Sequence, residues 1–77
     1  MDYCRHIVMD LPGTEVQVQV FEYDANMVVW YGASFELFTQ CAGKTIKDIV
    51  KQFIKSLQFN GGTVVSDSVI NKGVHLH

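Results

Sequence analysis

The feature that most constrains the fold is an amphipathic pattern of helical period over residues 44–58. Apolar residues recur there every three or four positions, a spacing that places them on one face of a helix. They are Ile46, Ile49, Val50, Phe53, Ile54 and Leu57. Thr45 followed by Asp48 is typical of a capped helix start, and Asn60-Gly61-Gly62 is typical of a helix end. The pattern predicts a single helix whose apolar face packs on another layer.

Lysine recurs at the same spacing on the other side of this helix, at Lys44, Lys47, Lys51 and Lys55. Residues 44–58 therefore carry a net charge of +3, since Asp48 is their one acidic residue. Residues 1–43 carry −5, because six acidic residues there face a single arginine. This distribution predicts an acidic sheet portion and a basic helix, which favours association between unlike surfaces.

Runs of β-forming residues lie on both sides of the helix. Residues 15–23 alternate Val16, Val18 and Val20 with polar residues, which predicts a strand with one buried face. Residues 27–31 are apolar without alternation, which predicts a central strand covered on both sides. Further strands are expected at 3–10, 35–40, 63–70 and, as a short tail, 74–77.

Turn-forming residues separate these runs. Pro12-Gly13 and Asp24-Ala25-Asn26 are expected to be turns. Gly32-Ala33-Ser34 is either a tight hairpin or a bulge in one long bent strand. The sequence thus predicts one α+β domain over residues 1–77, with the element order β-β-β-(β)-α-β-(β). We expect a two-layer sandwich in which one helix packs on a mainly antiparallel sheet of four to six strands. The helix should bury its apolar face against Val16, Val18 and Val20 or their opposite-phase neighbours.

One helix covers only part of such a sheet, so one sheet face should stay open. Hydrophobic residues make up 48% of the 77 residues, more than so small a core can hide. These two points predict a small non-enzymatic protein-interaction or assembly module that binds a protein partner or a second copy, as a homodimer. Aromatic residues cluster between positions 21 and 38, and we expect Trp30, Tyr31 and Phe35 at the contact.

The alternative function is nucleic-acid binding through Lys44, Lys47, Lys51 and Lys55. A net charge of −2 argues against a charge-driven nucleic-acid binder. No arginine or aromatic residue accompanies the lysines on the exposed side of the helix, where lysine commonly fills solvated positions.

Catalytic, metal and cofactor sites have no specific motif in this chain. Cys4 and His6 near one end, and His75 and His77 at the other, could form a zinc site if the first and last strands were neighbours. Their spacing matches no standard zinc pattern, so we expect no metal and no cofactor. Cys41, between a strand and the helix, reads as a small buried residue rather than a nucleophile.

The chain opens without a signal-peptide pattern and holds no apolar run of membrane-spanning length. The two cysteines form no disulfide framework. We therefore expect a cytoplasmic protein with free thiols and no membrane segment.

Overall fold

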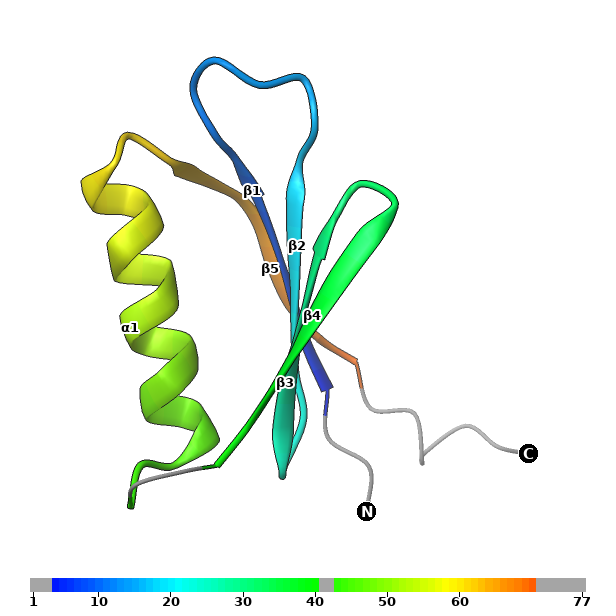
Figure 1. Cartoon of the computed structure of the whole chain (residues 1–77), viewed down its shortest axis with the longest axis vertical. Coiled ribbons are helices and arrows are strands. Elements are labelled where there is room, and N and C mark those ends of the chain that lie inside the picture. The colour runs from blue at the N-terminus through cyan, green and yellow to red at the C-terminus, as the bar shows by residue number, and fades with distance from the viewer. Residues whose placement is uncertain (1–3, 41–42, 71–77) are drawn as a thin grey trace.

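A computed structural model describes residues 4–40 and 43–70, and it confirms the small α+β fold (Figure 1). Five strands and one helix form two layers in this part of the chain. The elements are β1 (Cys4–Asp10), β2 (Val18–Glu22), β3 (Asn26–Tyr31), β4 (Ser34–Thr39), α1 (Ile46–Phe59) and β5 (Thr63–Ile70). The sheet is antiparallel throughout, with strand order β4-β3-β2-β1-β5.

Gly32 and Ala33 form a tight turn that separates β3 from β4. Tyr31 pairs with Ser34 across this turn, and Gly32 has a φ of 70°, a conformation that glycine adopts without strain. The segment is therefore a hairpin and not a bulge. The turn before β3 is also confirmed, since the Tyr23 amide donates to the Asn26 carbonyl at 2.8 Å.

The helix spans Ile46–Phe59, against the expected 44–58, and its N-cap is Thr45 as the sequence indicates. Thr45 accepts a hydrogen bond from the Asp48 amide, and the Asp48 carboxylate accepts one from the Thr45 amide, so the capping box is complete. Asn60 caps the other end, and Gly61 follows with a φ of +94°. The chain then crosses back, and β5 pairs with β1 rather than with β4.

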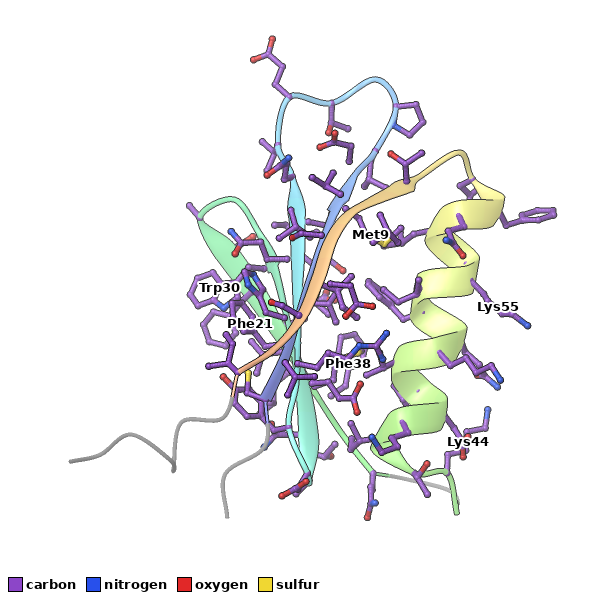
Figure 2. All side chains as sticks on the ribbon, turned by 180° about the vertical axis from the view of Figure 1, so that it is seen from behind. Met9, Phe21, Trp30, Phe38, Lys44 and Lys55 are labelled. Atoms are coloured by element: carbon purple, nitrogen blue, oxygen red, sulfur yellow. The ribbon has the colours of Figure 1, made fainter. Side chains whose placement is uncertain are left out.

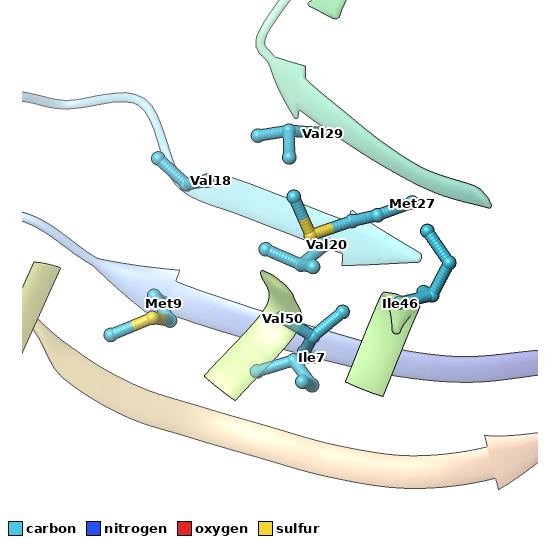
Figure 3. Packing of buried hydrophobic residues seen from close by; sticks show 8 residues of the cluster. All are labelled: Ile7, Met9, Val18, Val20, Met27, Val29, Ile46 and Val50. Carbon is cyan, nitrogen blue, oxygen red and sulfur yellow. The ribbon is translucent and has the colours of Figure 1, made fainter. Parts of the chain in front are cut away.

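The core lies between α1 and one face of the sheet, and Figure 3 shows its packing. Strands β1, β2 and β3 contribute their alternate residues, and α1 contributes Ile46 and Val50. Ile49, Phe53, Ile54 and Leu57 complete the predicted apolar face as partly buried residues. The fully buried cluster is Ile7, Met9, Val18, Val20, Met27, Val29, Ile46 and Val50.

Two strand predictions need correction. The strand expected at 15–23 spans only Val18–Glu22, and Val16 lies outside it with 49% of its surface exposed. β3 was expected to be covered on both sides, yet only Met27 and Val29, which face the helix, are buried, while Val28 and Trp30 are half-buried. The expected tail strand at 74–77 lies outside the described residues, as do Cys41, His75 and His77.

Candidate interaction surface

The sheet face opposite α1 is covered by no other described element (Figure 1). Residues directly opposite each other in an antiparallel sheet point to the same side, so the register defines this surface. It consists of two adjacent rows that run across all five strands, which we call the open face. The rows are Ser66, Val8, Gln19, Trp30 and Phe35, and Ser68, His6, Phe21, Val28 and Leu37.

None of these ten residues is Asp, Glu, Lys or Arg. Figure 2 shows Trp30 and Phe21 on the side of the sheet away from the helix, whereas Met9 and Phe38 lie between the two layers. The open face can therefore make apolar, aromatic and neutral polar contacts, the mixture found at the centre of protein interfaces.

Aromatic rings cluster within the open face. The rings of Trp30 and Phe35 are 4.8 Å apart, and the His6 ring stacks on Phe21 at 4.4 Å with an interplanar angle of 9°. A 2.9 Å hydrogen bond between the His6 Nε2 and the Gln19 Oε1 holds that imidazole in place. On the β4 edge of this face, Phe35 is 56% exposed and Leu37 is 58% exposed. Rigid, exposed aromatic side chains are typical of interface anchors.

The three residues expected at the contact do not share one face. Trp30 and Phe35 lie together on the open face, but Tyr31 points to the helix side, because it pairs with Val18 and Ser34. The Tyr31 hydroxyl donates a long 3.4 Å hydrogen bond to Glu36. Partial burial, followed by the Glu36 charge, raises the pKa of Tyr31.

Cys4 and Tyr23 lie at the margin of the open face. Cys4 is a free, buried thiol that pairs with Ile70 across the β1–β5 ladder. Burial raises the pKa of Tyr23, and the neighbouring Cys4 thiol raises it further. Cys4 and His6 occupy one face, two residues apart, as the sequence indicates.

The four lysines of residues 44–58 have different surroundings. Lys47 leans towards the sheet, and its Nζ lies 3.3 Å from the Glu22 Oε2. Lys44 donates a 3.3 Å hydrogen bond to Gln52 near the start of α1. Lys51 and Lys55 are exposed, and they line a groove of about 390 Å³ between α1 and Arg5. Lys47 lines the same groove, and Lys44, Lys51 and Lys55 line a second one of about 310 Å³ together with Asp48 and Gln52.

Glu22 is a buried charge that the sequence analysis did not single out. Its side chain is only 2% exposed, and it accepts contacts from Arg5 on β1 and Lys47 on α1, both at 3.3 Å. The sequence does hold a signal for it. Glu22 shares the phase of Val18 and Val20, so alternation places a carboxylate on the buried face of β2.

Arg5 continues this network to the sheet edge. Its guanidinium holds Asp67 with two hydrogen bonds of 2.7 and 2.8 Å, a bidentate arrangement. These bonds from Arg5 hold the pKa of Asp67 below its ordinary value, and Asp67 raises the pKa of Arg5. The network joins β5, β1, β2 and α1, and its two positive and two negative side chains have a formal net charge of zero.

In the described part of the chain, no three His, Cys, Asp or Glu side chains come close enough to hold a metal ion. The same residues include no helix that is long and apolar enough to cross a membrane. Comparison of this chain with protein-family models, with curated proteins and with solved structures finds no match.

Proposed function

We propose that this chain is a small non-enzymatic protein-interaction module that self-associates through its open face. The observation that carries the proposal is the uncharged ten-residue surface centred on Trp30, Phe21 and Val28. The absence of formal charge on these ten residues disfavours a charged partner, because its ions would lose water without gaining a counter-charge. A second copy of the same face meets this requirement.

The size of the open face supports the same partner. Five strands about 4.8 Å apart, paired over a length of roughly 18 Å, give a flat area of about 430 Å² per copy. The side chains that project from the sheet add to this area. Two copies then bury about 900 Å² or more, near the ~1,000 Å² that a specific interface needs. Two sheets packed in this way lie about 10 Å apart and keep α1 of each copy on the outside. The free Cys4 thiol suits a reducing compartment, which supports the cytoplasm as the location.

Trp30 and Tyr31 provide a matched pair of variants, because they are neighbours on β3 that face opposite sides of the sheet. Threonine keeps β-propensity at either position. We expect Trp30→Thr to lower the molar mass measured by light scattering at micromolar concentration, and Tyr31→Thr to leave it unchanged. Val28→Thr, which changes shape little, should weaken association in the same direction as Trp30→Thr. Equal behaviour of the Trp30 and Tyr31 variants would refute a contact through the open face.

Nucleic-acid binding is the alternative, and Lys51 and Lys55 beside Arg5 are the residues that favour it. This function predicts micromolar, salt-sensitive binding to duplex or single-stranded DNA. Binding should then be lost in the Lys51→Glu, Lys55→Glu double variant and kept in Trp30→Thr. The self-association proposal predicts no saturable binding in this titration.

A further inference from the structure

The edge strand β4 borders a groove that the helix leaves uncovered. α1 lies closest to β2, β3 and β5, so β4 extends beyond it (Figure 1). The rings of Phe38 on β4 and Phe53 on α1 are 6.2 Å apart across this boundary. The groove has a volume of about 580 Å³. It is lined by Met27, Leu37, Phe38, Thr39, Lys44, Ile49, Gln52 and Phe53.

The outer side of β4 is suited to strand pairing. Within the described sheet β4 pairs only with β3, so alternate amides and carbonyls on its other side lack strand partners. Proteins usually protect such edges with charged side chains, above all lysine, or with proline or a bulge. The strand β4 has no lysine, proline or bulge, and Glu36 is its one charged residue. The other edge strand, β5, carries Asp67, and a register irregularity interrupts its ladder with β1.

We propose that β4 is a self-pairing edge, through which two copies join antiparallel, with Glu36 of each copy beside Lys44 of the other. This contact is separate from the open face, since it uses the edge strand β4 and the groove between β4 and α1. In a symmetric antiparallel pair of β4 strands, residues that lie directly opposite each other must point to the same face of the sheet. Two registers therefore give the longest overlap of Ser34–Thr39, one centred on Glu36 and the other on Leu37.

Charge distinguishes these two registers. Centring on Glu36 sets two carboxylates directly opposite each other, which is destabilising. Centring on Leu37 sets two leucines opposite each other and places Glu36 opposite Phe38 of the second copy. Phe38 lines the groove together with Lys44, so the incoming carboxylate lies at the basic end of that groove. The symmetry makes this Glu36–Lys44 contact twice in each pair.

Charge reversal tests the edge contact independently of the open face when it is performed in the Trp30→Thr background. We expect the Trp30→Thr parent to form a two-chain species by sedimentation equilibrium. Adding Lys44→Glu or Glu36→Lys should weaken that pairing about ten- to a hundredfold, because both ion pairs become repulsive. An equimolar mixture of the two variants should regain the pairing, since the carboxylate introduced at position 44 of one variant then faces the lysine introduced at position 36 of the other. Lys55→Glu, on the same helix but away from the groove, is the control and should pair like the parent.

Three results would overturn the proposal: a parent that stays a single chain, a Lys44→Glu variant that pairs as tightly as the parent, or a mixture that gains nothing. Far-ultraviolet circular dichroism confirms that each protein is folded. Should Trp30→Thr unfold, Val28→Thr provides the background instead. Failure of this mixing experiment leaves the Trp30 and Tyr31 comparison unaffected, so the two proposals fail separately.

Discussion

Replacing Glu22 separates the effect of its charge from the effect of its volume, because the side chain is buried between the layers and contacts two cations. Glu22→Gln keeps the shape and removes the charge. Glu22→Met keeps a similar volume and removes the hydrogen-bonding groups as well. The amide of glutamine can accept from Arg5 or Lys47, but its NH₂ group then faces the other cation.

The contacts of Glu22 determine how much stability each substitution should cost. Both contacts of Glu22 are 3.3 Å long, and charge-assisted bonds are strongest at about 2.7–2.9 Å. Breaking a buried ion pair costs about 3–5 kcal/mol where the remaining charge is stranded without water. Here Arg5 keeps Asp67 at 2.7 Å, and the Lys47 side chain is 75% exposed. We therefore expect Glu22→Gln to cost about 1–2 kcal/mol and Glu22→Met to cost about 1 kcal/mol or less.

Urea denaturation followed by circular dichroism measures both values. All proteins are compared at one concentration, because self-association would stabilise the folded chain. A cost of 1 kcal/mol lowers the melting temperature of a domain this small by about 4–8 °C. A Glu22→Met variant that loses about 3 kcal/mol or more, and more than Glu22→Gln, would refute this reasoning, since the carboxylate itself would then be required for folding.

Three further predictions concern the fold. Val50→Ala should cost about 2–3 kcal/mol in urea denaturation, because it empties a fully buried site, whereas Lys51→Ala should change stability by less than about 0.5 kcal/mol. Thr45→Ala should lower the free energy of unfolding by about 1 kcal/mol, since it removes the hydroxyl that accepts a hydrogen bond from the Asp48 amide. Unchanged stability would contradict the capping box. The Arg5–Asp67 pair lowers the Asp67 pKa, so its stabilisation is present above the unfolded pKa of about 3.9 and is lost as pH falls through the folded value. In urea titrations at several pH values, Asp67→Asn should reduce the loss of stability in acid, and an unchanged pH profile would contradict that role.

The bounds of α1 and β5 were predicted from the sequence almost as they are observed. α1 was predicted within two residues at its start and one at its end, because its apolar face and its capping box agree. β5 was predicted at its observed bounds. The start of β2 was wrong, because alternation continues through Val16 although the chain leaves the sheet there. Periodicity indicates which residues can share a face, but cross-strand pairing decides where a strand begins.

The candidate surface was only partly predictable. An open sheet face with aromatic residues follows from one helix and five strands, and Trp30 and Phe35 lie on it. Tyr31 was assigned to the same contact because residues 27–31 lack alternation in polarity, so the sequence did not assign a side to each residue. The position of β5 beside β1 also could not be read from the sequence, since the crossing from α1 could lead to either edge of the sheet.

Fluorescence of Trp30 tests the central claim most directly, because it is the only tryptophan in the chain and it lies on the open face. Acrylamide quenching is measured across a dilution series, together with the molar mass from light scattering, in the Lys44→Glu variant so that pairing through β4 contributes little. If two copies cover their open faces, quenching should be weak at high concentration and should rise on dilution as the mass falls towards the 8.7 kDa of one chain. Quenching that stays constant while the mass falls, or a mass of 8.7 kDa at every concentration, would contradict self-association through this face.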